Sequence, residues 1–114
     1  MNFTTSERYN CVILEFKGDV MGGPDTVALN EQLHKLIDEG KKNVIVDLAK
    51  VNFMNSSGLG MLIGGYTTMK NAGGDLRICN ATDKIESLLM ITKLITVFQH
   101  FKSLEEAVKS FETA

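Results

Sequence analysis

The fold is decided by residues 43–79, which read NVIVDLAKVNFMNSSGLGMLIGGYTTMKNAGGDLRIC. The stretch opens with residues 43–48, a nearly continuous apolar run that is typical of a strand covered on both faces. A loop over residues 49–56 follows, and from Ser57 the apolar side chains recur at helical spacing. Residues 75–79 then alternate polar and apolar side chains, as a half-buried strand does. The stretch therefore predicts a strand, a helix and a second strand in succession.

The residues before this stretch continue the alternation of strands and helices. Residues 10–16, NCVILEF, are rich in β-branched and aromatic side chains, and they predict a strand that pairs with residues 3–8 as a hairpin. Residues 24–39 predict a helix, because Pro24 suits the first helical position and leucines follow at helical spacing up to a terminating Gly40. The first part of the chain thus contributes two strands and one helix.

The residues after the stretch complete the pattern. A short helix is predicted after Thr82, and Val97 and Phe98 predict a last short strand. Residues 103–111 predict a terminal helix whose start carries the S-x-x-E pattern of a capping box. Strands that alternate with helices predict an α/β fold in which helices pack on a mixed sheet. We expect residues 1–114 to form one domain of this class.

Composition narrows the class of protein. Of the 114 residues, 44% are hydrophobic and 23% are charged, which is ordinary globular usage and predicts a chain that folds on its own. The formal net charge is −2 and no segment clusters Lys and Arg with aromatic residues, so we expect no direct binding to DNA or RNA. No signal segment opens the chain and no apolar run approaches the roughly 20 residues that cross a bilayer, so we expect a cytoplasmic protein without a membrane anchor.

The cysteines and histidines predict neither a metal site nor a redox motif. Cys11 and Cys79 lack CxxC spacing, and His34 and His100 stand alone. Both cysteines lie in apolar, strand-like runs, so we expect buried thiols in a reducing compartment. We therefore expect no bound metal and no cofactor.

The most chemically suggestive segment is the turn N-S-S-G-L at residues 55–59. A helix that begins at Ser57 places its hydroxyl beside backbone amides without intrahelical partners, where a negative group such as phosphoserine is favoured. The helix also contains Gly60, Gly64 and Gly65, each costing up to about 1 kcal/mol relative to alanine, so close packing or an approaching partner must compensate. The serines could instead serve only as the helix N-cap, which helix-start statistics alone favour.

Other chemistries fit this segment less well. The glycine-rich helix lacks the lysine of a GxxxxGK[ST] loop, and no GxGxxG motif follows a strand. A serine hydrolase would need G-x-S-x-G around its nucleophile, with histidine and carboxylate partners that cannot be assigned here. An enzyme that uses Ser57 as its nucleophile therefore requires His34 or His100 within hydrogen-bond reach.

Residues 44–80, VIVDLAKVNFMNSSGLGMLIGGYTTMKNAGGDLRICN, resemble the core of a STAS domain, specifically that of the bacterial anti-sigma factor antagonists. The likeness covers nearly the whole chain, from the G-D pair at Gly18 and Asp19 to the closing helix. It implies a four- to five-stranded mixed sheet with about four helices packed mainly on one side. It also implies that a partner anti-sigma factor, itself a serine kinase, phosphorylates Ser57 and that a phosphatase resets it.

The resemblance implies a binding protein and not an enzyme, and we expect it to be a monomer. The unphosphorylated form would bind the anti-sigma factor and free the sigma factor, and the charge and bulk of a phosphate would end the interaction. The candidate partner-binding residues are Asp19, Met21, Asn55, Ser56, Ser57, Gly58, Leu59, Met61, Gly64, Gly65 and Thr68. The last four are expected on the helix face opposite Leu62 and Tyr66.

Two positions depart from the pattern of the family. Asn55 stands where the motif usually carries aspartate, which removes a charge beside Ser57, although asparagine can still cap the turn. Met21 occupies the place where many members have a second acid after the G-D pair. These residues motivate an alternative function, in which the chain is a STAS scaffold that binds a nucleotide, a lipid or another regulator in a larger complex without a sigma switch.

Overall fold

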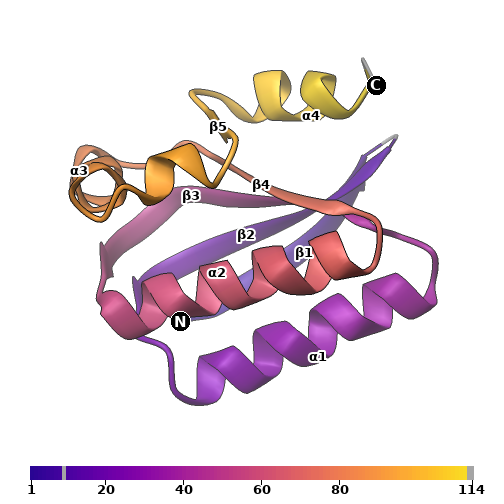
Figure 1. The fold of residues 1–114 in the computed structure, drawn as a ribbon, viewed down its shortest axis with the longest axis horizontal. Coiled ribbons are helices and arrows are strands. Elements are labelled where there is room, and N and C mark those ends of the chain that lie inside the picture. The colour runs from indigo at the N-terminus through magenta and orange to yellow at the C-terminus, as the bar shows by residue number, and fades with distance from the viewer. Residues whose placement is uncertain (9, 113–114) are drawn as a thin grey trace.

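Within residues 1–8 and 10–112, which the computed structural model describes, five strands form one mixed sheet in the order β1-β2-β3-β4-β5. β1 pairs antiparallel with β2, and the later strands all pair in parallel. Figure 1 shows the sheet with helices on both of its faces. The strands are β1 (Asn2–Arg8), β2 (Cys11–Val20), β3 (Asn43–Met54), β4 (Asp75–Cys79) and β5 (His100–Phe101). The predicted α/β class and its opening hairpin are confirmed.

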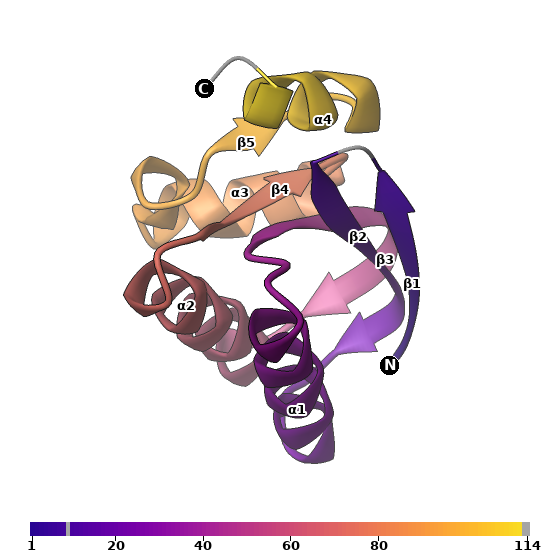
Figure 2. The same cartoon turned by 90° about the vertical axis from the view of Figure 1, so that its right-hand side faces the viewer.

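The helices lie mainly on one face of this sheet. They are α1 (Pro24–Asp38), α2 (Ser56–Asn71), α3 (Asp83–Ile91), the short 3-10 turn η1 (Leu94–Thr96) and α4 (Leu104–Glu112). Residues of α1, α2 and α3 share one apolar core, whereas α4 covers the opposite face, as Figure 2 shows. Pro24 occupies the first helical position of α1, and Gly40 follows its end with φ +78°, as the sequence predicted.

Each face of the sheet carries its own core. On the larger side Leu14 of β2 packs with Leu29 of α1 and Leu62 of α2, and none of the three is more than 1% exposed. The smaller core under α4 consists of Cys11, Ile13, Ile45, Cys79, Ala107, Val108 and Phe111. Both cysteines are buried and free, which confirms the prediction of core thiols.

β3 is longer than the sequence predicts, and the predicted loop over residues 49–56 is wrong. The strand continues to Met54 and pairs with the end of β2, where Val20 is the partner of Met54. Two register shifts along this pairing each place an extra residue on β3. As a result Leu48, Val51 and Met54 are all buried at a spacing of three residues, which does not match the period-two pattern of a regular strand.

The region after α3 also differs from the prediction. Val97 and Phe98 do not form a strand, and the two-residue strand β5 lies just after them. Phe98 is buried because its ring packs edge-on against Tyr66, with the two ring centroids 5.4 Å apart. The terminal helix is confirmed, and the Ser103 hydroxyl oxygen accepts the Glu106 N–H at 3.2 Å, which is one half of the predicted capping box.

Candidate functional site

The turn between β3 and α2 is organised by Asn55. Its side-chain Oδ1 accepts a hydrogen bond from the N–H of Gly58 at 2.8 Å, and its carbonyl oxygen accepts the N–H of Leu59 at 2.9 Å. With an extended backbone, Asn55 is the N-cap of α2. The helix therefore begins at Ser56, one residue earlier than predicted, and the alternative in which a serine caps it is wrong.

The Ser57 hydroxyl remains accessible in the first turn of α2. Ser56 and Ser57 are both exposed, and within residues 1–8 and 10–112 neither hydroxyl has a hydrogen-bond partner. The first turn of α2 contains no acidic residue, so no side chain there neutralises the positive end of the helix dipole. Ser57 is thus open to another molecule in a place that favours an added negative charge.

Two glycines hold the end of β2 against this turn. A Cβ on Gly58 would overlap the carbonyl oxygen of Val20, and the same oxygen accepts the N–H of Asn55 at 3.3 Å. Gly22 has φ +80°, and a Cβ there would lie 2.9 Å from the Cβ of Ser57. Close packing between the β2–α1 loop and the start of α2 therefore fixes where Ser57 lies.

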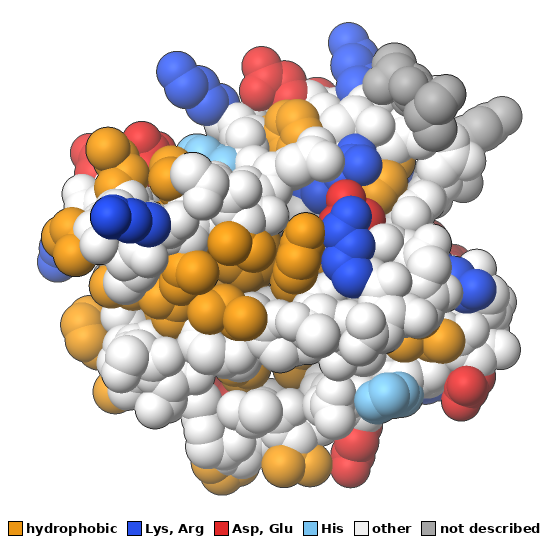
Figure 3. Space-filling view, viewed as in Figure 1, with side chains coloured by type: hydrophobic (Ala, Val, Ile, Leu, Met, Phe, Trp, Pro, Cys, Tyr) orange, Lys and Arg blue, Asp and Glu red, His pale blue; other side chains and the backbone are white. Residues whose placement is uncertain are grey.

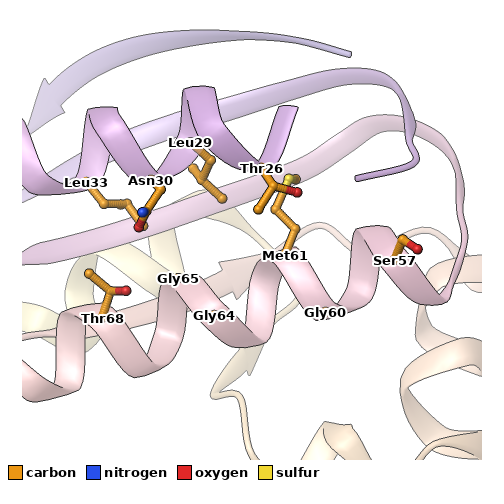
Figure 4. A pocket seen from close by; sticks show the side chains of 10 residues that line it. All are labelled: Thr26, Leu29, Asn30, Leu33, Ser57, Gly60, Met61, Gly64, Gly65 and Thr68. Carbon is orange, nitrogen blue, oxygen red and sulfur yellow. The ribbon is translucent and has the colours of Figure 1, made fainter. Parts of the chain in front are cut away.

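A groove of about 350 Å³ runs between α1 and α2, and Ser57 lies at one end of it (Figure 4). Leu29, Leu33 and Met61 are the buried apolar side chains of the groove. Asn30 and Thr68 add polar groups from opposite helices (Figure 4). The complete lining is Thr26, Leu29, Asn30, Leu33, Ser57, Gly60, Met61, Gly64, Gly65 and Thr68.

The glycines in the middle of α2 have different physical explanations. Gly65 is buried, and a Cβ there would lie 3.1 Å from Leu33 and 3.3 Å from Leu76, so contact with α1 and β4 accounts for it. Gly60 and Gly64 are exposed, and a Cβ on either of them would meet nothing within 4 Å. Internal packing therefore does not account for these two residues, although each lowers helix stability by about 1 kcal/mol relative to alanine.

The structure brings together five of the predicted partner-binding residues, because Ser57, Met61, Gly64, Gly65 and Thr68 all line the groove. They lie on the side of α2 that faces α1. Met61 is only 4% exposed and Gly65 is buried, so these two residues shape the groove from within.

The other predicted residues surround the turn. Asp19 and Met21 are exposed at the end of β2 and just beyond it. Leu59 is 4% exposed and belongs to the main core, so its side chain anchors the turn to the core and is not available to a partner. Sequence reasoning missed Phe53, which is 49% exposed and pairs in register with Asp19. An aromatic residue within a segment predicted to be a loop was the signal that could have found it.

The groups that an enzymatic serine needs do not meet at Ser57. His34 is exposed on α1 and His100 lies on β5, and neither residue lines the groove. Among the residues that the structure describes, no cluster of His, Cys, Asp and Glu could hold a metal ion. Cys11 and Cys79 lie under α4, where burial raises the pKa of both thiols, that of Cys79 to about 12.

No helix in the described ranges combines the length and the apolar character needed to cross a membrane.

The model of the STAS domain family matches residues 2–107 of this chain. The anti-sigma-B factor antagonist of Staphylococcus aureus is 30% identical over 91 residues, which are 80% of this chain and 82% of that protein.

Solved structures have the same fold. A Thermotoga maritima protein assigned to the anti-sigma factor antagonists superimposes with a TM-score of 0.87 at 17% identity, over 96% of this chain and 94% of that one. The phosphorylated form of the Bacillus cell fate determinant SpoIIAA superimposes with a TM-score of 0.74 at 17% identity, over 96% of this chain and 98% of that one. This chain therefore belongs to the STAS domain family, and the curated relatives to which it is similar include anti-sigma factor antagonists.

Proposed function

We propose that this chain is a phosphorylation-gated anti-sigma factor antagonist. Its unphosphorylated form binds an anti-sigma factor that is also a serine kinase, and this binding releases the sigma factor. Phosphorylation of Ser57 ends the interaction, and a phosphoserine phosphatase restores it. The protein acts in the cytoplasm as a monomer and binds no nucleic acid. The observation that carries the proposal is the exposed Ser57 hydroxyl at the end of the groove, left unbonded because Asn55 caps α2.

The open surface of α2 supports a protein partner in the groove. Gly60 and Gly64 lie one turn apart and leave the helix backbone without side-chain cover, which allows the backbone of another chain to approach closely. Met21 and Phe53 add exposed apolar surface next to the turn, at 47% and 49% exposure. A partner that covers the groove and this apolar surface also covers Ser57.

A phosphate on Ser57 would act on both sides of the binding equilibrium. In the complex it would bring roughly −1.5 to −2 charges into an interface with apolar surface, where the phosphate loses hydration. In the free protein the amides of the α2 N-terminus would stabilise the same charge. Both effects favour the free form, and each 1.4 kcal/mol that they contribute lowers the affinity about tenfold.

The proposal is tested by incubating the chain with its anti-sigma factor and ATP, followed by mass spectrometry. We expect one phosphate on Ser57 and none on Ser56. The Ser57→Ala variant should keep the affinity of the unmodified chain and lose phosphorylation, whereas Ser57→Asp should bind more weakly. Ser56→Ala is the matched control for the site of modification and should be phosphorylated on Ser57 as the parent is. Absence of phosphate from Ser57 under conditions in which the two proteins bind would overturn the proposal.

Asn55 and Met21 favour one other function, a STAS scaffold that holds a ligand or another regulator without a phosphorylation switch. The N-cap of α2 carries no charge, and Met21 offers no acid for a kinase to contact. In that case a phosphate on Ser57, or its replacement by aspartate, would leave the affinity for the physiological partner unchanged in a pull-down assay.

A further inference from the structure

Large apolar side chains are exposed where α3 ends and η1 begins. Met90 is 59% exposed, Ile91 is 80% exposed and Val97 is 38% exposed. Leu94 and Ile95 are partly buried and connect these residues to the main core. Figure 3 shows hydrophobic side chains gathered over α3, η1 and the neighbouring part of α2. We call Met90, Ile91, Leu94, Ile95 and Val97 the α3 patch, and a group of exposed apolar side chains of this size has the character of an interaction site.

Lys93 lies within this patch in an unfavourable backbone conformation. Its φ is +63°, in the left-handed region where helices commonly end on glycine. The turn is closed by a hydrogen bond from the N–H of Lys93 to the carbonyl oxygen of Met90 at 3.0 Å. A lysine at this position lowers the stability of the fold relative to glycine, so its ammonium group calls for a reason outside local folding.

The charges near the patch indicate what chemistry covers it. Lys84 lies two turns before Ile91 on the same side of α3. In the part of the chain that the structure describes, neither Lys84 nor Lys93 has an acidic partner. A complementary surface would therefore carry apolar side chains with carboxylates at their edge. An anionic membrane fits less well, because an extended anionic surface cannot avoid Asp83 and Glu86 in the first turn of α3, whereas a protein can place its carboxylates at Lys93 and away from these acids.

We propose that the α3 patch is a second contact area for the anti-sigma factor, which meets it with an apolar segment edged by carboxylates. This inference rests on the proposed function. Figure 1 shows α3 and the start of α2, which carries Ser57, at the same end of the molecule, so one partner can reach both. The turn then switches binding on and off, and the patch selects the partner by its charge and shape.

The test is titration calorimetry of the anti-sigma factor against the unphosphorylated parent and three variants of the full chain. Ile91→Ser should lower the affinity at least about tenfold, as loss of an apolar anchor does. Lys93→Gly should lower the affinity about threefold in low salt and have little effect in high salt, because rim charges are screened. Val27→Ser is the matched control, since Val27 is 60% exposed on α1 outside the patch.

Thermal unfolding separates a binding role of Lys93 from a structural one. Lys93→Gly should raise the melting temperature, because glycine adopts the left-handed conformation without strain, while it weakens binding. Lys93→Arg should keep the affinity of the parent because it keeps the charge. These opposite changes in stability and affinity would support the inference.

Several outcomes would overturn it. Equal affinity of Ile91→Ser and the parent would refute the patch as a contact area while leaving the proposed function in place. Failure of the parent itself to bind the anti-sigma factor would refute the proposed function as well. Two further assays test other occupants of the patch. Self-association of the parent in sedimentation would assign the patch to a second copy of the chain, and flotation with phosphatidylserine vesicles would assign it to a membrane. Either assignment requires that Ile91→Ser abolish the association and leave the affinity for the anti-sigma factor unchanged.

Discussion

At the scale of single residues, the glycines of α2 divide into those that internal packing explains and those that it does not. Gly58 and Gly65 lie in close contact with β2 and α1, whereas Gly60 and Gly64 lie next to open space. Only the first pair is therefore required by the isolated fold. Asn55 makes a similar distinction, because it caps the helix and so leaves Ser57 free to be modified.

Gly60→Ala should stabilise the protein and weaken its binding. The new methyl group meets nothing within 4 Å, so helix propensity raises the free energy of unfolding by up to about 1 kcal/mol. The same methyl group reduces the affinity for the anti-sigma factor if a partner occupies the groove. Denaturant unfolding and titration calorimetry measure the two effects.

Gly58→Ala is the control for the stability measurement. It should lower the free energy of unfolding by about 1–3 kcal/mol, because its Cβ overlaps Val20. Unchanged affinity of Gly60→Ala would contradict the docking groove.

Cys79 should make stability fall at alkaline pH. Burial, with a smaller effect of Asp47, raises the pKa of this thiol from 9.0 to about 12 in the folded chain. The Cys79 thiol therefore differs in protonation between the two states only between these two pH values. In that range the thiol is ionised in the unfolded chain and protonated in the folded chain. Stability is lost as pH rises through this window, by about 1.4 kcal/mol per pH unit.

The measurement for Cys79 is urea unfolding between pH 8 and about 11, for the parent and for Cys79→Ala. The variant starts from lower stability but should lose less with rising pH. Lysine, tyrosine and Cys11 titrate in both proteins, so the difference between the two slopes reports on Cys79 alone. Parallel slopes would show that the thiol ionises equally in the folded and unfolded chains.

At the scale of elements, α4 is held on the sheet by a small set of contacts. The guanidinium carbon of Arg77 lies 3.9 Å from the ring centroid of Phe111, and its Nη1 donates to the Ser110 hydroxyl oxygen at 2.6 Å. Asp75 accepts a hydrogen bond from Nε of the same arginine at 2.9 Å. These contacts keep Cys79 covered by the helix.

Phe111→Ala should loosen α4 and uncover the thiols beneath it. The ring is buried, and its loss should lower the free energy of unfolding by about 3 kcal/mol. Ellman's reagent should then label Cys79 faster than global unfolding allows, because the helix opens locally. Glu106→Gln, at an exposed position of the same helix, is the control. Labelling that follows the global unfolding rate in both variants would show that α4 and the rest of the sheet open together.

The elements also show which parts of a fold a sequence can predict. β4, α1, α4 and the first part of β2 were predictable because alternation, helical spacing and caps are local signals, whereas the continuation of β2 from residue 17 to Val20 was not predicted. The continuation of β3 to Met54 was not, because the register shifts that bury Val51 and Met54 arise from pairing with the end of β2. Phe98 was assigned to a strand on apolar character alone, although its burial comes from contact with Tyr66.

At the scale of the whole molecule, the candidate site combines local and tertiary features. The position of Ser57 at a helix start was predictable from a strand, a turn and a helix in sequence order. The groove was not, because its other wall comes from Thr26 and Asn30 of α1. Phe53 was missed for the same reason, since its place beside Asp19 depends on the pairing of β2 with β3.

Under the proposed function, a small modification would control a large surface. Ser57 lies where the groove reaches the N-terminus of α2, and the exposed apolar residues Met21 and Phe53 lie at the neighbouring ends of β2 and β3. Under the proposed function, a phosphate at this point would be favoured in the free protein and disfavoured under a partner. No movement of the sheet or its helices is needed for such a switch.

The most direct measurement is the affinity of the chain for its anti-sigma factor before and after stoichiometric phosphorylation of Ser57, by titration calorimetry. Mass spectrometry confirms the modified residue, and Ser57→Ala treated with kinase and ATP is the control. We expect phosphorylation to lower the affinity at least about a hundredfold, which corresponds to about 2.8 kcal/mol. An affinity that stays within about twofold of the unmodified value, with phosphate confirmed on Ser57, would contradict the account.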